Sequence, residues 1–215
     1  MSTIRAVISD FGGVLTNPLW EAFAGWNERV GADPGALGMA LQKAAEELGE
    51  HPLYALEKGH MTEAEFTAAV QAQLPPEIKL DGFREIYFSH LHPNEPMIEL
   101  MRELRGRGLR MAMLTNNVRE WEPLWRAKLP VDEIFDVVVD SAFVGMRKPE
   151  RAIYELTLER LGDTPGMRGT RLRGEECVFV DDVDVNCAMA TELGMTAVHY
   201  VSPEQAIDEI KRAIG

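Results

Sequence analysis

Residues 4–15, IRAVISDFGGVL, hold the first clue to the architecture of this 215-residue chain. The first half of this stretch is a short run of apolar and β-branched residues, which favours a buried β-strand over residues 4–9. The run stops at Asp10, and glycines follow at Gly12 and Gly13. Aspartate and glycine are also common turn formers, so the stretch alone predicts a strand and a turn and leaves the role of Asp10 open.

Apolar runs that end at polar residues recur along the chain. They predict further strands at residues 109–114, 135–139, 177–180 and 196–201. Helical patterns lie between them, at residues 95–107, 118–128, 149–161, 185–193 and 203–214. This alternation predicts an α/β fold with a Rossmann-like, doubly wound parallel sheet. Polar residues directly after the strands lie where such sheets bind ligands.

Residues 18–91 break the alternation, because they contain helical patterns only. Gly31 suits the end of a first helix, and Thr62 and Glu65 have the spacing of a capping box ahead of a later one. We therefore expect residues 1–17 and 92–215 to form the α/β core domain and residues 18–91 to form an inserted, all-helical cap domain.

The charge balance limits the range of partners. The chain has 22 Lys and Arg residues against 35 Asp and Glu residues, a net charge of −13. This excess of acid argues against nucleic acid and against a membrane surface, both of which favour basic proteins. The two cysteines, Cys177 and Cys187, form neither a disulfide framework nor a zinc motif. Without a signal-peptide pattern, we expect a cytoplasmic protein, and both a monomer and a homodimer remain open.

Five polar or charged residues that could take part in catalysis occur in a particular order along the chain. They are Asp10, Thr115, Lys148 and the adjacent acids Asp181 and Asp182. Lys148 stands directly before a proline that suits a helix start, and the others end predicted strands. Because the carboxyl ends of parallel strands meet at one edge of a sheet, we expect these side chains to gather there.

This ordered set resembles the four motifs of the haloacid dehalogenase-like hydrolase superfamily, over essentially the whole chain. Residues 10–15, 145–150 and 179–182, together with Asn186, are similar to one subgroup. That subgroup contains the phosphatase domain of soluble epoxide hydrolases and bacterial sugar-phosphate phosphatases. The resemblance implies a hydrolase whose helical cap is inserted where residues 18–91 stand.

The chemistry of the residues agrees with this resemblance. A carboxylate can attack phosphorus and form an acyl phosphate, which is the role expected for Asp10. A phosphate dianion repels that carboxylate, so we expect Mg²⁺, which prefers carboxylate and carbonyl oxygens. The expected ligands are Asp10, the carbonyl of Gly12 and Asp182. Asp181 is expected either close to the ion or behind the residues that bind it.

The remaining residues of the set would bind the phosphoryl group. Thr115 would donate its hydroxyl, and the amides of Asn116 and Asn117 would add donors at a helix N-terminus. Lys148 would offset negative charge on the nucleophile and the phosphoryl group. The main hypothesis is a Mg²⁺-dependent phosphatase of a small phosphorylated metabolite, acting through an aspartyl-phosphate intermediate.

Two other functions stay open. One is a haloacid dehalogenase-type hydrolase that acts on carbon–halogen bonds. Asp181 and Asp182 argue against it, because an unneeded pair of negative charges would repel a carboxylate substrate. The other is a non-catalytic protein that binds a phosphorylated metabolite. The presence of both Asp10 and Lys148 argues against that function.

One position departs from the superfamily pattern. Many of its phosphatases carry a second aspartate, a general acid and base, where this chain has Gly12. Such a group contributes about 10²–10⁴-fold in rate. We therefore expect a preference for leaving groups that depart without protonation, such as aryl phosphates, acyl phosphates and sugar 1-phosphates. By residue type alone, the candidates for a replacement acid in the cap are Glu21, His51, Glu57 and His60.

The cap is also expected to set specificity. Most of its apolar side chains should pack between helices, and a few should line the entrance to the site. The candidates are Trp20, Phe23, Trp26, Leu53, Tyr54 and Met61.

Overall fold

A computed structural model describes residues 3–33, 35–165 and 172–215. Its five strands are β1 (Ala6–Ser9), β2 (Arg110–Thr115), β3 (Val137–Asp140), β4 (Cys177–Asp181) and β5 (Thr196–His199). They form one parallel sheet in the order β3-β2-β1-β4-β5, which confirms the predicted doubly wound core. The chain runs outward from β1 to β3 and later returns to the other side of β1. The switch point of the sheet therefore lies beside β1, where ligands of such sheets bind.

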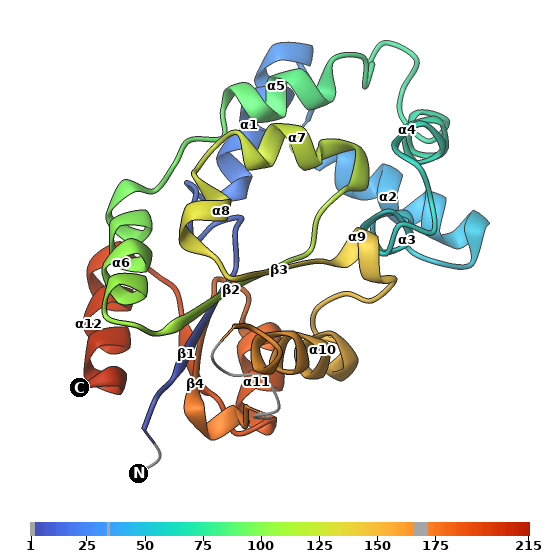
Figure 1. Cartoon of the computed structure of the whole chain (residues 1–215). Helices are drawn as coiled ribbons and strands as arrows, with labels where there is room; N and C mark the ends of the chain where they lie inside the picture. Colours follow the sequence, from blue (N-terminus) through green and yellow to red (C-terminus); the bar gives the residue numbers. More distant parts are fainter. Residues whose placement is uncertain (1–2, 34, 166–171) are drawn as a thin grey trace.

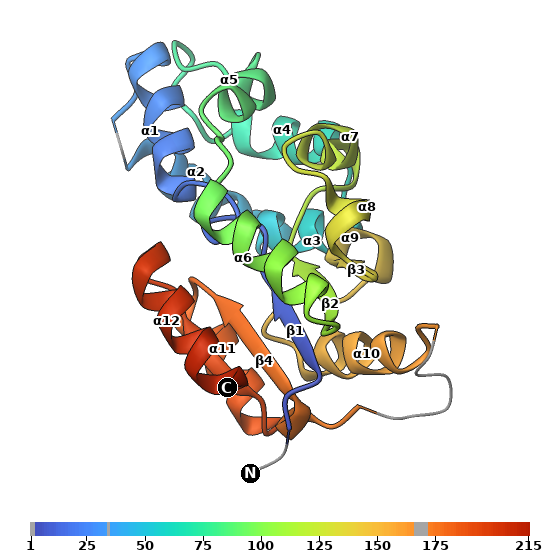
Figure 2. The ribbon, with the colours of Figure 1, turned by 60° about the vertical axis from the view of Figure 1, so that its left-hand side comes forward.

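Four helices cover the two faces of the sheet (Figures 1 and 2). They are α6 (Glu95–Gly106) and α12 (Pro203–Ile214) on one face, and α10 (Arg151–Gly162) and α11 (Asp184–Glu192) on the other. Successive residues of β1 alternate between the two apolar cores, with Val7 in the first and Ala6 and Ile8 in the second. Burial on both faces explains why the strands are continuous apolar runs.

Short elements connect the strands. They are η1 (Arg119–Trp121), α7 (Glu122–Arg126), α8 (Val131–Ile134), α9 (Ser141–Val144) and η2 (Gly174–Glu176). The prediction of one helix over residues 118–128 is wrong, because η1 is a 3₁₀ turn and α7 begins only at Glu122. Pro123 has no N–H and suits the first turn of a new helix rather than the middle of a longer one. The sequence of residues 162–174, GDTPGMRGTRLRG, predicts a long loop, and this stretch falls partly outside the described residues.

The predicted cap residues fold into five helices. They are α1 (Leu19–Val30), α2 (Ala36–Leu48), α3 (Pro52–Glu57), α4 (Glu63–Gln71) and α5 (Phe83–Ser89). Figure 1 shows them beyond the end of the sheet where β1 leads towards α1. Residues of α1, α2, α4 and α5 share a small apolar core around the fully buried Trp26. Gly31 ends α1 in a left-handed conformation, and Thr62 and Glu65 form the capping box at the start of α4, both as predicted.

The two connections between this helical segment and the core run side by side. Thr16 forms an isolated antiparallel bridge with Pro93, and the amide of Asn17 donates to the carbonyl of His92 at 2.9 Å. These bridged residues stand next to the predicted boundaries at 17 and 92. The division into two domains stays a prediction. Within the described ranges, no helix has the length and apolarity needed to cross a membrane.

Candidate active site

A buried ion-paired cluster lies at the carboxyl ends of β1 and β4. Lys148 Nζ is 2.8 Å from Asp10 Oδ1 and 2.6 Å from Asp181 Oδ2, and the lysine side chain is 1% exposed. The strands explain this meeting, because β1 and β4 are neighbours, Asp10 directly follows β1 and Asp181 is the last residue of β4. Such burial makes each charge depend on its partners, since an unpaired charge there would be costly.

Three carboxylates face one another in this cluster. One oxygen from each of Asp10, Asp181 and Asp182 lies within 4.8 Å of the other two. Asp181 accepts hydrogen bonds at both oxygens, because its Oδ1 accepts from Val183 N and Asn186 Nδ2 at 2.9 Å each and its Oδ2 accepts from Lys148. Asp182 is only partly buried and lines the cavity described below. We call Asp10, Asp181 and Asp182 the carboxylate cluster.

The carboxylate cluster carries an excess of negative charge. Burial raises the pKa of Asp10, and Asp181 and Asp182 raise it further against the opposing effect of Lys148. Burial and the neighbouring Asp181 also raise the pKa of Asp182. Burial alone would lower the pKa of Lys148, but Asp10 and Asp181 raise it. Three acids against one ammonium group form a set of hard oxygen ligands that fits a divalent cation.

The glycines after Asp10 make room for two neighbouring side chains. Gly13 has a φ of +79°, and a Cβ atom there would lie 2.3 Å from Asp182 Oδ2. Only glycine therefore lets Asp182 approach this turn. A Cβ atom at Gly12 would lie 3.0 Å from Leu19 Cδ1. A side chain at position 12, where the superfamily pattern described above would place an acid, would therefore lie tightly against the side chain of Leu19.

The Thr-Asn-Asn stretch ends β2 at the same edge of the sheet. Thr115 is 1% exposed, and its side chain lies beside that of Asn117. The side chain of Asn116 clasps the backbone of Lys148, accepting from its N–H at 2.8 Å and donating to its carbonyl at 3.0 Å. Asn116 therefore positions the lysine, a role that residue type alone did not indicate.

The helix N-terminus expected after Thr115 is absent. The 3₁₀ turn η1 follows instead, and the amide N–H of Asn117 donates to Ser141 Oγ at 3.0 Å. The expectation of a helix N-terminal anion site is therefore wrong, because α7 starts five residues after Asn117. Ser141 was not predicted, although its place directly after β3 is the signal that could have found it.

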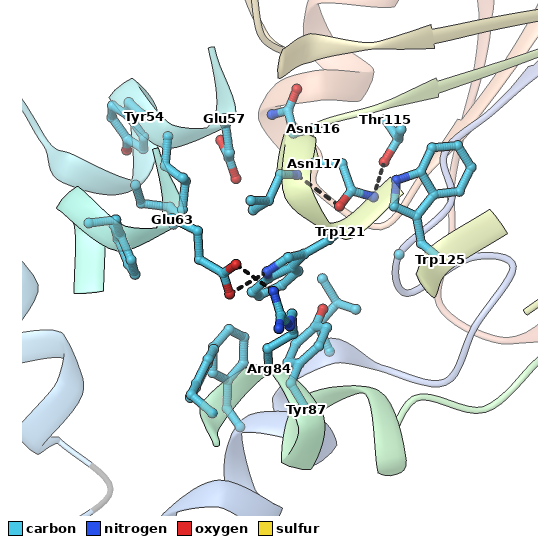
Figure 3. Close-up of a pocket in the computed structure, with 18 of the residues that line it drawn as sticks. Tyr54, Glu57, Glu63, Arg84, Tyr87, Thr115, Asn116, Asn117, Trp121 and Trp125 are labelled. Carbon is cyan, nitrogen blue, oxygen red and sulfur yellow. Dashed lines mark hydrogen bonds and ion pairs between the residues drawn. The ribbon is translucent and has the colours of Figure 1, made fainter. Parts of the chain in front are cut away.

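A cavity of about 1220 Å³ opens above the carboxylate cluster. Its lining includes every predicted site residue except Asp181, which is fully buried behind Asp182. Figure 3 shows Thr115, Asn116 and Asn117 on one side of this cavity and cap residues facing them. The cavity therefore joins the predicted phosphoryl site to the helical segment.

The cap candidates divide into those that line the cavity and those that do not. Of the four acid candidates, Glu57 lines it, and its Oε2 accepts from Arg147 Nε at 2.7 Å. Burial raises the pKa of Glu57, and Arg147 opposes this effect. Glu21, His51 and His60 are not among the described lining residues.

The six apolar candidates divide in the same way. Phe23, Leu53 and Tyr54 line the cavity. Trp26 is fully buried in the core of the cap, and Trp20 is 67% exposed outside the cavity. Met61 also lies outside the lining. The expectation that most would be core and a few would line the site holds for only part of the set.

A polar cluster in the cavity was missed altogether. The carboxylate of Glu63 on α4 accepts from Trp121 Nε1 and from Arg84 Nη1, at 2.8 Å each (Figure 3). Arg84 Nη2 also donates to Glu85 at 3.2 Å. These residues come from α4, α5 and η1, which are separate in the sequence, so no local sequence pattern predicts the cluster.

Three curated relatives align with nearly the whole chain. Acyl-CoA dehydrogenase family member 10 of Mus musculus is 29% identical over 98% of this chain, which spans 19% of that protein. Sesquiterpene phosphatase astK of Aspergillus oryzae is 27% identical over 100% of this chain and 98% of its own length. Bifunctional epoxide hydrolase 2 of Sus scrofa is 25% identical over 99% of this chain, which spans 39% of that enzyme.

Two solved structures share the fold. A HAD-family enzyme from Bacteroides thetaiotaomicron, in complex with magnesium and inorganic phosphate, superposes with a TM-score of 0.66 at 22% identity, covering 91% of this chain and 93% of that one. The L-2-haloacid dehalogenase of Xanthobacter autotrophicus superposes with a TM-score of 0.62 at 18% identity, covering 94% and 80%.

The order of motifs, the parallel sheet and the carboxylate cluster thus agree with one hydrolase family. The sequence profile of the haloacid dehalogenase-like hydrolases matches residues 4–194. This chain therefore belongs to the haloacid dehalogenase-like hydrolases.

Proposed function

We propose that this chain is a Mg²⁺-dependent phosphatase that hydrolyses a phosphorylated metabolite through an aspartyl-phosphate on Asp10. The observation that carries the proposal is the carboxylate cluster, three acids with oxygens within 4.8 Å of one another, beside Lys148 and below a cavity. A dehalogenase attacks carbon and needs no cation, so three clustered acids favour phosphate chemistry over that alternative.

The residues present fit a magnesium ion. Asp10, Asp182 and the carbonyl of Gly12 would hold it, because Mg²⁺ prefers hard oxygen ligands. Asp181 is better suited to supporting the residues that bind the ion than to binding it directly, since both of its oxygens already accept hydrogen bonds from the protein. When bound, the ion would supply positive charge between the nucleophile and the phosphoryl oxygens.

The protein's own groups perform the proposed reaction in two displacements. An oxygen of Asp10 attacks phosphorus, and the bond from phosphorus to the ester oxygen breaks, so that the leaving group departs as an alkoxide and takes a proton from water. Water then attacks the same phosphorus and gives up a proton to solvent, and the bond to Asp10 breaks, releasing inorganic phosphate and the free carboxylate. Lys148 stabilises the negative charge that develops in both steps, and the Thr115 hydroxyl donates to a phosphoryl oxygen.

The surroundings of Gly12 support the expected preference among leaving groups. Gly12 has no side chain, and the side chain beside it is that of Leu19, so the departing oxygen gains no proton from that point of the site. We expect kcat/KM to rise as the pKa of the leaving alcohol falls. A flat dependence, measured with chemistry rate-limiting, would contradict this expectation.

The relatives support phosphate ester hydrolysis. The relative from Aspergillus oryzae is named a sesquiterpene phosphatase, and one from Methanocaldococcus jannaschii, aligned over 62% of this chain at 30% identity, is named a glyceraldehyde 3-phosphate phosphatase. The two names specify different substrates, so these relatives support hydrolysis of a phosphate ester but do not identify the alcohol part of the substrate.

The deciding experiment is phosphate release from a broad panel of phosphate monoesters, with Mg²⁺ and with EDTA. Wild type should turn over only with Mg²⁺, and Asp10→Asn should be inactive in both conditions. Turnover by carefully purified Asp10→Asn would refute the nucleophile. Chloride release from a 2-haloacid without Mg²⁺ would support the dehalogenase, and binding without turnover would support the non-catalytic alternative.

A further inference from the structure

The cavity is larger than a small polar metabolite requires. Its volume of about 1220 Å³ exceeds the range of about 300–1,000 Å³ that is usual for ligand pockets. Among the described residues, nine aromatic side chains line it, together with leucines from the helical segment. Leu19 extends this apolar lining to the edge of the phosphoryl site, beside Gly12.

A connected aromatic wall lines the part of the cavity formed by α1, α5 and η1. It consists of Phe23, Phe83, Tyr87 and Trp121. The ring centroids of Phe23 and Tyr87 are 5.5 Å apart, and those of Tyr87 and Trp121 are 5.1 Å apart. Phe23 remains 36% exposed although it contacts this cluster, so part of its apolar surface is free to cover a ligand.

Two polar side chains of the cavity, those of Gln71 and Glu63, are bonded to other groups of the protein. Both ends of the Gln71 amide are bonded to backbone, to Ile78 and to Leu80, at 2.9 Å each. Both oxygens of Glu63 are bonded to Trp121 and Arg84. A ligand hydroxyl beside these two side chains would lose its bonds to water and find its neighbours already bonded, which costs free energy.

The charges of the cavity accommodate one anionic group only. Among the described lining residues the cations are Arg84, Arg147 and Lys148. Arg147 pairs with Glu57, and Arg84 pairs with both Glu63 and Glu85. Lys148 is paired with Asp10 and Asp181, and it is the lining cation that lies at the carboxylate cluster, where the proposed metal ion and the phosphoryl group would bind. A second phosphate or a carboxylate at the far end would meet carboxylates instead of a free cation.

We infer that the substrate is a monophosphate ester of a bulky, uncharged and predominantly apolar alcohol, whose carbon skeleton lies against the aromatic wall. This inference rests on the proposed phosphatase function and narrows its substrate class. The phosphate end is fixed by the carboxylate cluster and Lys148, and the apolar end gains affinity from the surface it buries.

The test is a homologous series of straight-chain primary alkyl monophosphates, from ethyl to decyl, kept below their micelle concentrations. The leaving oxygen is the same throughout, so only the apolar tail changes. We expect kcat/KM to rise roughly three- to fourfold per methylene until the cavity is filled. Glycerol phosphate and an alkyl bisphosphate of equal length should be poorer substrates than the matching monoester.

A cavity-filling variant locates the effect. Ala68 lines the cavity from α4, and Ala188 is an exposed helical residue outside it. Ala68→Phe should lower kcat/KM for decyl phosphate by tenfold or more and leave ethyl phosphate within twofold. Ala188→Phe, the matched control, should leave both unchanged. Equal loss on both substrates for Ala68→Phe would overturn the assignment of the tail to this cavity.

The proposed phosphatase function and the proposed substrate class would be refuted by different results. If no phosphate is released from any ester, p-nitrophenyl phosphate included, the phosphatase function itself is wrong. If p-nitrophenyl phosphate is hydrolysed but kcat/KM is flat or falls with chain length, the phosphatase stands and the apolar substrate class is overturned. Calorimetric binding of the same series to Asp10→Asn gives the chain-length dependence without turnover, and a flat series there would also overturn the class.

Discussion

The two ends of the cavity differ in the side chains that form them. At the strand ends, charged groups are buried and each is held by named partners: Lys148 by Asp10 and Asp181, and its backbone by Asn116. At the helical end, aromatic rings form the surface, and the polar side chains bond mainly to one another or to backbone. Under the proposed function, the strand ends would supply the chemistry, and the aromatic wall on α1, α5 and η1 would supply the selectivity.

The two ends of the cavity also differ in the kind of interaction that dominates them. Charge interactions in the buried cluster are strong and depend on a few atoms, because the surroundings screen them poorly. Apolar contacts along the aromatic wall are weak individually and scale with the area buried. Substitutions at the strand ends should therefore be severe and affect all substrates, whereas substitutions at the helical end should be mild and depend on the substrate.

The largest effect is expected from Lys148→Met. It leaves the buried Asp10 and Asp181 without their common cation, so the free energy of unfolding without metal should fall by about 3–5 kcal/mol. Activity should fall on the order of 10³-fold or more on every substrate. Chemical denaturation and kcat/KM measure the two effects. Lys58→Met is the control, because it removes a part-exposed pair with Glu150 and should cost at most about 1 kcal/mol.

The next effect concerns Asp140, a buried carboxylate at the end of β3. Burial raises its pKa from 3.8 to about 6, against the effect of the hydrogen bond from the Ala142 amide. A raised pKa means that the folded state binds this proton more tightly than the unfolded state. Asp140 should therefore lower the free energy of unfolding as the pH rises from about 4 to about 6, by up to about 3 kcal/mol.

Asp140→Asn removes that titration and keeps an oxygen for the cap bond to Ala142. The variant should match wild type near pH 4, and its stability advantage should grow until about pH 6 and then stay constant. Denaturation midpoints of both proteins at several pH values measure this difference. A difference that does not vary with pH would show that Asp140 is not the responsible group.

The sequence was most informative where local pattern and topology coincide. The run before Asp10 and the run before Asp181 predict neighbouring buried strands, and their final residues meet as expected. The pairing of Lys148 with both acids follows from the same edge of the sheet. The parallel sheet and the gathering of these side chains are therefore confirmed, while the roles of the residues remain a proposal.

The helical end could not be predicted in the same way. Glu63 and Trp121 meet only because α4 folds back over η1, and Leu19 reaches Gly12 through the turn into α1. Such contacts depend on how separate elements pack, which no periodicity records. The role of Asn116 was also hidden, because an asparagine after a strand suits a turn, a ligand contact and a backbone clasp equally well.

A smaller effect is expected at the turn that connects the two ends. A Cβ atom at Gly13 would collide with Asp182, so Gly13→Ala should displace that carboxylate and lower kcat/KM by about 10- to 100-fold on short and long substrates alike. Gly108→Ala is the matched control, since Gly108 also has a positive φ, +89°, but nothing within 4 Å of the added atom. If both variants lose activity equally, backbone strain rather than the displacement of Asp182 is responsible.

The smallest effect is expected from Trp121→Phe. The indole N–H of Trp121 donates to Glu63 at 2.8 Å and so ties the segment after β2 to α4. Phenylalanine keeps a ring beside Tyr87 but loses this bond, whose net contribution is about 0.5–1.5 kcal/mol. The wall should loosen where an apolar tail lies. We expect KM for a long alkyl phosphate to rise roughly two- to tenfold, with kcat and all values for ethyl phosphate unchanged.

The control for this variant is Trp20→Phe, because Trp20 is 67% exposed and lies outside the cavity lining. It should leave kcat and KM unchanged for both substrates. A fall in kcat on ethyl phosphate in Trp121→Phe would mean that the helical end also holds the strand ends in place. The separation of chemistry from selectivity would then fail, because the bond from Trp121 to Glu63 would support Thr115 and its neighbours as well as the aromatic wall.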